Sequence, residues 1–160
     1  MTMDAAFLGR HEIRTSDAME ALGLRIGAQL RPGDLLILTG PLGAGKTTFT
    51  RGLAEGLGVR GPVQSPTFVI ARTHPSLIWG APLVHVDAYR LGSAAELDDL
   101  DIDFVRSVVV IEWGRPMASA VADRWWDIEI ERPVGGDHDL DDEDLDADAP
   151  RFVTLTRVEG

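Results

Sequence analysis

The feature that most constrains this chain is a glycine-rich loop between an apolar run and a helical pattern. Residues 35–38 are all aliphatic and predict a strand buried on both faces. Residues 40–47 follow with the spacing G-x-x-x-x-G-K-[ST]. Beyond Lys46, apolar residues recur at helical spacing as far as Leu57, and Gly58 then predicts the end of the helix. Strand, loop and helix therefore come in the order that a phosphate-binding loop requires.

The residue types of this loop suit a nucleoside polyphosphate. Its glycines let successive backbone N–H groups face a phosphate, and the following helix adds its positive N-terminal end. Lys46 supplies a charge for the β- and γ-phosphates, the Thr47 hydroxyl suits Mg²⁺, and Thr48 is expected to donate toward the α-phosphate. The alternative is a chance glycine turn before an ordinary helix. The expected nucleotide-binding residues are Gly40, Leu42, Gly43, Ala44, Gly45, Lys46, Thr47 and Thr48.

The identity of Lys46 strengthens this interpretation. The chain has 15 Lys and Arg residues, and Lys46 is its only lysine. A compact ammonium, in place of the planar guanidinium used everywhere else, stands where a phosphate-binding loop needs a point charge.

Composition limits the function classes. The 160 residues fit a single domain, residues 1–160, and no segment approaches the ~20 continuous apolar residues of a membrane span. The first residues lack the pattern of a signal peptide, and the chain has no cysteine, so we expect a cytoplasmic protein without a disulfide framework or thiolate metal site. A net charge of −11 argues against a broad nucleic-acid surface. Residues 137–148 carry eight of the acids and predict a mobile insert.

Two further apolar runs end in an acid. Residues 83–87 end in Asp87, and residues 108–112 end in Glu112. Carboxylates at the carboxyl ends of buried strands lie where open α/β sheets bind ligands. One such acid can hold Mg²⁺ while the other orients the attacking water, and the residues leave open which does which. His85, which alternates with two valines, is predicted to be a packed or hydrogen-bonded histidine and not a metal ligand.

The remaining patterns outline an α/β fold. Residues 17–20 resemble a capping box at the start of a helix that continues toward Leu30, and residues 93–96 resemble a second one. Strands are predicted at residues 7–13 and, after Pro66, up to residue 70. Residues 125–131 and 152–158 alternate like half-exposed strands and predict an antiparallel edge.

A hydroxyl on the segment 65–70 can reach Mg²⁺ or the γ-phosphate and act as a switch. Alternatively, Ser65 and Thr67 only close a turn. The residues alone favour the turn.

Four motifs in sequence resemble one family. GPLGAGKTTFTRGL, SPTF, HVDAYRL and VVIEW closely resemble the TsaE (YjeE-like) family, the P-loop ATPase of bacterial tRNA threonylcarbamoyladenosine biosynthesis. The resemblance covers most of residues 16–131 and a final strand that Arg151 opens. It departs from the family at Met19, where threonine is common beside the adenine, and in the acidic insert.

The resemblance implies a P-loop NTPase-like three-layer fold, with a mostly parallel central sheet, helices on both faces and an antiparallel edge at the C-terminal end. It implies a cytoplasmic ATPase that is weak alone, binds ATP or ADP with Mg²⁺, and works with TsaB and TsaD, meeting tRNA only through their complex and no membrane. By resemblance, Thr47 and Glu112 hold Mg²⁺, Thr67 lies on a switch, and Asp87 orients water or lies behind the metal. Lys46, Asp87 and Thr67 are then the expected catalytic residues.

Two other functions use the same loop. One is a small-molecule kinase, although such enzymes usually carry an arginine-rich lid and the long insert here is acidic. The other is a non-catalytic nucleotide-sensing module.

Overall fold

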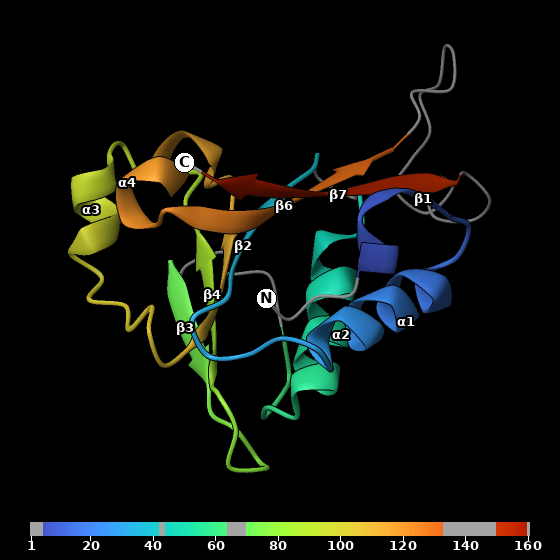
Figure 1. The fold of residues 1–160 in the computed structure, drawn as a ribbon, viewed down its shortest axis with the longest axis horizontal. Helices are drawn as coiled ribbons and strands as arrows, with labels where there is room; N and C mark the ends of the chain where they lie inside the picture. The colour runs from blue at the N-terminus through green and yellow to red at the C-terminus, as the bar shows by residue number, and fades with distance from the viewer. Residues whose placement is uncertain (1–4, 42–43, 64–69, 133–149, 160) are drawn as a thin grey trace.

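A computed structural model of the protein describes residues 5–41, 44–63, 70–132 and 150–159, and shows one seven-stranded sheet in the order β1-β7-β6-β2-β5-β4-β3 (Figure 1). The strands are β1 (Gly9–Ile13), β2 (Leu35–Thr39), β3 (Ala71–His74), β4 (Leu83–Asp87), β5 (Val108–Glu112), β6 (Arg124–Glu131) and β7 (Arg151–Glu159). The α-helices are α1 (Ser16–Gly27), α2 (Lys46–Leu57), α3 (Ala94–Asp98) and α4 (Ala118–Val121), with 3₁₀ turns η1 (Ala5–Phe7) and η2 (Arg115–Met117).

The sheet is parallel in its centre and antiparallel at both edges. Strands β6, β2, β5 and β4 pair in parallel, whereas β7 pairs antiparallel with β6 and β1 antiparallel with β7. This confirms the predicted α/β fold and its antiparallel C-terminal edge. The other edge carries the antiparallel strand β3, whose direction the sequence did not indicate. The four parallel strands bring the carboxyl ends of β2, β4 and β5 to the same edge of the sheet.

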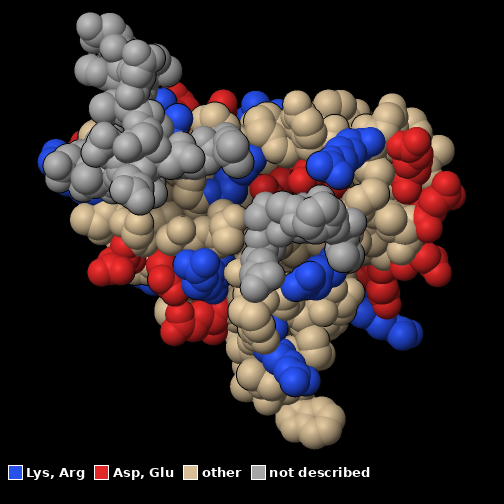
Figure 2. Space-filling view, turned by 180° about the vertical axis from the view of Figure 1, so that it is seen from behind, with Lys and Arg blue, Asp and Glu red and all other residues tan. Residues whose placement is uncertain are grey.

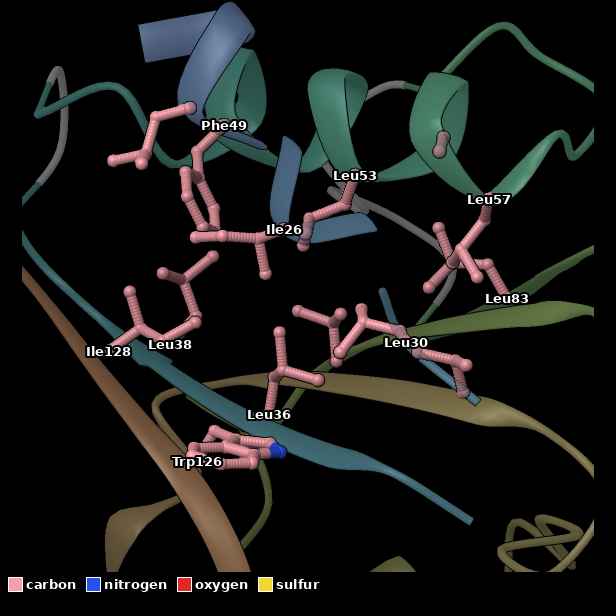
Figure 3. Close-up of a cluster of buried hydrophobic side chains, with 14 of the residues drawn as sticks. Ile26, Leu30, Leu36, Leu38, Phe49, Leu53, Leu57, Leu83, Trp126 and Ile128 are labelled. Carbon is pink, nitrogen blue, oxygen red and sulfur yellow. The ribbon is translucent and has the colours of Figure 1, made fainter. Parts of the chain in front are cut away.

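Helices cover both faces of the sheet, as expected. On one face, α1 and α2 pack side by side over the sheet, and their apolar side chains form the larger core (Figures 1 and 3). The buried side chains labelled there are Ile26, Leu30, Leu36, Leu38, Phe49, Leu53, Leu57, Leu83, Trp126 and Ile128. On the other face, a smaller core includes Leu97 of α3 and Ala118 of α4.

The α1–α2 contact is close because four glycines lie in it. A Cβ atom placed on Gly52 would collide with the carbonyl oxygen of Glu20, and one on Gly56 would collide with that of Leu24. A Cβ atom on Gly23 or Gly27 of α1 would likewise collide with a backbone carbonyl oxygen of α2. The two helices therefore approach backbone to backbone, which fixes the position of α2 and of the loop that precedes it.

The predicted helix ends are partly wrong. The N-cap of α1 is Thr15, whose Oγ1 accepts from the backbone N–H of Ala18 at 3.0 Å, so the capping box predicted at residues 17–20 does not form. Asp17 instead lies in the first turn, where the helix dipole favours an acid. The helix also ends at Gly27, short of Leu30.

The second predicted cap is confirmed with one change. Ser93 caps α3 by accepting from the N–H of Glu96 at 3.4 Å, but the Glu96 carboxylate accepts from the N–H of Gly92 instead of from Ser93. The predicted strand up to residue 70 and the acidic insert 137–148 fall wholly or largely outside the described residues. Strand β3 begins after that predicted strand, at Ala71.

The surface seen from behind carries Arg, Asp and Glu side chains interspersed, with no continuous basic stripe among the residues drawn in colour (Figure 2). The turn between β3 and β4 projects from the body and carries the exposed side chains of Leu77, Ile78 and Trp79. In the part of the chain that the structure describes, no helix combines the length and hydrophobicity that crossing a bilayer requires.

Candidate functional site

The first turn of α2 carries backbone N–H groups that its N-cap residue leaves without a side-chain acceptor. That residue is Gly45, with φ +110°, which has no side chain to accept from them. The first-turn N–H groups of a helix have no partner within the helix, so an anion is the expected complement. The chain passes close to its neighbours at Gly40 and Gly45, where a Cβ atom would be crowded. A Cβ on Gly40 would lie 2.8 Å from the Ile130 carbonyl oxygen, and one on Gly45 would lie 3.2 Å from Cε of Met19.

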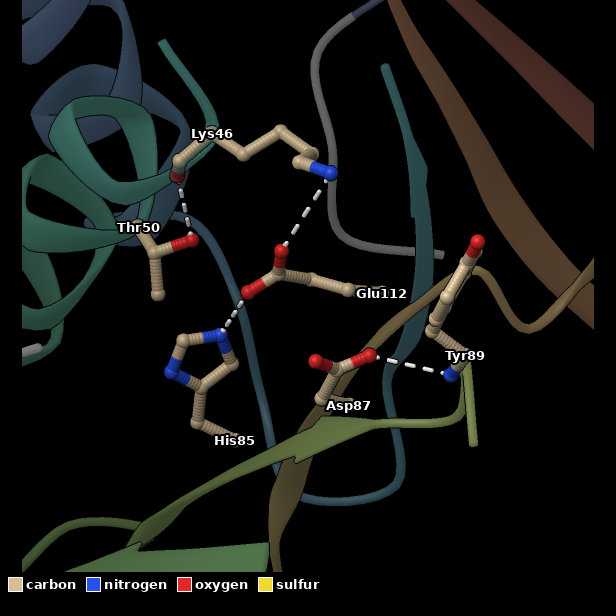
Figure 4. A network of polar contacts seen from close by, with 6 residues as sticks. All are labelled: Lys46, Thr50, His85, Asp87, Tyr89 and Glu112. Carbon is tan, nitrogen blue, oxygen red and sulfur yellow. Dashed lines mark hydrogen bonds and ion pairs between the residues drawn. The ribbon is translucent and has the colours of Figure 1, made fainter. Parts of the chain in front are cut away.

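Lys46, the first residue of α2, extends its side chain toward the end of β5 (Figure 4). Its Nζ atom lies 3.6 Å from Oε1 of Glu112, and the two side chains are only 10% and 6% exposed. The same Nζ lies 4.2 Å from the centre of the Trp113 ring, a cation–π contact. The single lysine and a strand-end carboxylate, 66 positions apart in the sequence, thus meet at the start of α2.

Glu112 has a second partner on the neighbouring strand. Nε2 of His85 lies 2.5 Å from Oε2 of Glu112, and the ring is 1% exposed. Because β4 and β5 pair in parallel with Asp87 opposite Glu112, His85 lies diagonally across from Glu112 and on the same face. This confirms the prediction of a hydrogen-bonded histidine, although its partner was not predicted.

Asp87 ends β4 beside Glu112 (Figure 4). Its Oδ1 accepts from the backbone N–H of Tyr89 at 2.9 Å, which holds the carboxylate at the turn that follows the strand. The exposed Tyr89 ring meets Trp113 edge to face, with the centroids 5.6 Å apart. The two strand-end acids are thus neighbours, but only Glu112 contacts Lys46.

The backbone and the next turn hold Trp113 over the site. Trp113 has a left-handed φ of +62°, and its N–H donates to the Leu38 carbonyl at 3.0 Å. Arg115 then donates to both carboxylate oxygens of Asp127 on β6, at 3.0 and 2.7 Å. Hydrogen bonding to Asp127 raises the pKa of Arg115, so this anchor stays charged. The contact between Lys46 and Trp113 was not predicted from the sequence.

The other predicted residues divide into two groups. Thr47 and Thr48 lie half-buried in the first turn of α2, and Ala44 is buried just before it. Thr48 also lines a pocket with Thr15, Met19 and Arg151, beside the start of α1. The predicted residues Leu42, Gly43 and Thr67 lie outside the described residues.

The donors present fit a magnesium–polyphosphate. Among the residues that the structure describes, no three His, Asp or Glu side chains gather to hold a metal ion by themselves. Mg²⁺ in nucleotide sites is usually held by one or two protein oxygens together with phosphates and water. One carboxylate, one threonine hydroxyl on the first turn of α2, and uncapped helix N–H groups form that kind of donor set.

Comparison with known proteins points to one family. Residues 13–138 match the sequence model of TsaE, described as threonylcarbamoyl adenosine biosynthesis protein TsaE. A tRNA threonylcarbamoyladenosine biosynthesis protein TsaE of Streptomyces coelicolor is 53% identical over 141 residues, which cover 86% of this chain and 89% of that one. The Bacillus subtilis protein of the same name is 40% identical over 71% of each chain. The crystal structure of Bacillus subtilis YdiB superposes with a TM-score of 0.65 at 32% identity, covering 94% of this chain and 86% of that one.

Proposed function

This chain belongs to the TsaE family of threonylcarbamoyl adenosine biosynthesis proteins, and on that premise we propose that it binds ATP with Mg²⁺ and hydrolyses it slowly. The proposal places this activity in a subunit that works with TsaB and TsaD to modify tRNA adenosine beside the anticodon. The observation that carries it is the meeting of Lys46 with Glu112 at the uncapped start of α2. A chance glycine turn would have no reason to bring the only lysine onto a buried strand-end acid.

The binding roles follow from the donors. The backbone N–H groups at the start of α2 donate to the phosphate oxygens, and Lys46 neutralises the β- and γ-phosphates. The hydroxyl of Thr47 and a carboxylate oxygen of Glu112 hold Mg²⁺. When bound, Mg²⁺ would supply positive charge that stabilises the negative charge developing on the phosphate during transfer. The pocket beside Thr15, Met19 and Thr48 lies next to this start and suits the base.

Asp87 is the acid proposed to act on water. Its carboxylate lies beside Glu112 and is oriented by the Tyr89 N–H, but it contacts no cation in the described residues. A carboxylate that is held in place and has no cation beside it is suited to accept a proton from water or to align the water molecule. Thr67 remains a sequence-based candidate for a switch residue.

Slow hydrolysis by the isolated chain follows from the same geometry. Trp113 and Glu112 hold the ammonium of Lys46 through a cation–π contact and an ion pair. A partner that completes the site then raises turnover, so we propose that hydrolysis is coupled to assembly with TsaB and TsaD. A net charge of −11 favours contact with tRNA through these partners and not directly. A role in tRNA modification is consistent with the cytoplasmic location expected from the sequence.

The test is phosphate release from ATP, measured with the chain alone, with purified TsaB and TsaD, and with both partners and tRNA. We expect slow release alone and faster release when the partners are present. A rate that the partners leave unchanged contradicts the coupling. A phosphorylated metabolite appearing in place of free phosphate identifies a kinase instead.

A further inference from the structure

His85 is the buried polar residue of the site for which the proposed function has no role. It lies on β4 between Val84 and Val86, its ring is 1% exposed, and its Nε2 lies 2.5 Å from Glu112 Oε2. Figure 4 shows the ring directed at Glu112 from the side opposite Lys46. An ionised carboxylate can only accept, so the ring donates its Nε2–H.

The other ring nitrogen shows that this contact is not a by-product of packing. Nδ1 of His85 is buried and has no hydrogen-bond partner among the described residues. A buried polar atom without a partner destabilises the folded protein. An aliphatic side chain like those of Val84 and Val86 would fill the position without that cost. The bond to Glu112 is therefore what the imidazole supplies at this position.

We propose that His85 is the positioning residue of Glu112. By donating to Oε2, it fixes the rotation of the carboxylate so that Oε1 faces Lys46 and the start of α2. A glutamate has three rotatable side-chain bonds, so without this donor the buried carboxylate can adopt other rotamers, in which Oε1 does not face the start of α2. This inference rests on the proposed function, because it requires Glu112 to be a magnesium ligand.

The chain offers matched substitutions at this position. His85→Gln keeps an N–H donor at about the reach of Nε2, whereas His85→Leu removes the donor and retains an apolar side chain. Glu112→Gln is the reference for a carboxylate that has been lost. Each variant is titrated calorimetrically with a non-hydrolysable ATP analogue, with and without Mg²⁺, so the measurement does not depend on turnover.

We expect His85→Leu to lose about ten- to a hundredfold of the affinity that Mg²⁺ adds, the range seen when residues behind a metal ligand are removed. Without Mg²⁺, the same variant should bind the analogue as the parent does. His85→Gln should recover most of the Mg²⁺ effect. If His85 has only a structural role, its substitution should change the Mg²⁺-free affinity or the unfolding midpoint, and the gain in affinity on adding Mg²⁺ should stay the same as in the parent.

The outcomes separate the two levels of the argument. If Glu112→Gln keeps the parent's Mg²⁺ effect, Glu112 is not the ligand, and the metal role and the His85 inference are both wrong. If Glu112→Gln loses the effect and His85→Leu keeps it, only the His85 inference is wrong. If His85→Leu and His85→Gln lose the Mg²⁺ effect equally, the ring acts through packing and not through its N–H donor. That result also contradicts the His85 inference. Should His85→Leu fail to fold, His85→Asn replaces it, since its shorter amide falls short of Glu112.

Discussion

The ammonium of Lys46 lies over the face of Trp113, 4.2 Å from the ring centre, while Glu112 approaches it from below at 3.6 Å. The one lysine of the chain is therefore held at two points. Both holding residues are adjacent in the sequence, at the end of β5. The start of α2 and the end of β5 are thus linked through side chains.

Replacing Lys46 should separate nucleotide binding from folding. Lys46→Met removes a charge-assisted contact to phosphate, worth about 1.5 to 3 kcal/mol, so we expect nucleotide affinity to fall by about ten- to a hundredfold. The fold should persist, because Glu112 keeps its hydrogen bond to His85. Calorimetric titration with an ATP analogue measures the affinity, and a urea unfolding curve measures the stability.

Lys46→Arg restores the charge but not the compact ammonium, and should recover only part of the affinity. Unchanged binding in Lys46→Met would place the nucleotide elsewhere.

Gly45→Ala should weaken nucleotide binding as well as stability. Its φ of +110° is unfavourable for any residue with a Cβ, and the added Cβ meets the Met19 side chain at 3.2 Å. We expect a loss of about 1 to 2 kcal/mol in the free energy of unfolding, together with weaker binding, because the start of α2 has to shift.

Gly58→Ala is the matched control at the other end of the helix, where φ is +76° and the Cβ meets Ile78. The control should destabilise the protein without changing its intrinsic nucleotide affinity. Equal affinity losses in both variants would contradict a site at the start of α2.

Gly52→Ala should be among the more damaging single-methyl additions to the described helices. The Cβ would collide with the Glu20 carbonyl oxygen of α1, which belongs to backbone and cannot rotate away. We expect a loss of about 1 to 3 kcal/mol in the free energy of unfolding, the usual effect of overpacking. Gly92→Ala serves as control, because its nearest contact is the movable Glu96 side chain at 3.5 Å. Urea denaturation compares the two, and similar midpoints would show that α1 and α2 can separate at little cost.

His74 should make the stability of the fold depend on pH below neutrality. Burial lowers the pKa of His74 from its ordinary value of 6.5, and nearby His85 and Arg72 lower it further, while the bond to the Arg60 carbonyl opposes them. Above pH 6.5 the ring is neutral in the folded and the unfolded chain, so it adds no pH dependence there. As pH falls below 6.5, the unfolded chain takes up the proton first, so the free energy of unfolding decreases.

The measurement is the urea midpoint at several pH values for the parent and for His74→Tyr. The parent should lose more stability than His74→Tyr between neutral and mildly acidic pH. Parallel curves for the two proteins would show that His74 is not the titrating group.

The sequence predicted well wherever a pattern is local. The aliphatic run at residues 35–38, the glycine loop and the helical spacing after Lys46 each depend on neighbours in the chain, and β2 and α2 form where expected. The two acid-ended strands were also found, since five consecutive buried residues leave a clear apolar signal in β5. Their proximity follows from the rule that parallel strands share a carboxyl edge.

The features that the sequence did not predict depend on how strands pair with one another, or on a choice between two residues that suit the same position. The contact between His85 and Glu112 needs the register of β4 against β5, and the signal available was only that H-x-D and E stand at the ends of two predicted strands. The direction of β3 depends on the short connection through residues 75–82, which returns the chain antiparallel onto β4. At the start of α1, Thr15 and Asp17 both suit a cap, and the choice of Thr15 could not be made from residue type alone.

The glycine contact between α1 and α2 has a consequence for how the protein responds to its ligand. In the proposed function, the phosphates bind at the start of α2 and the base binds in the pocket at the start of α1. Since the two helices pack backbone to backbone, both halves of the nucleotide would dock on one tightly packed helix pair and not on two lobes that close over it. We therefore expect a movement that reports ATP to a partner to arise outside this helix pair, in the turns that follow the acid-ended strands.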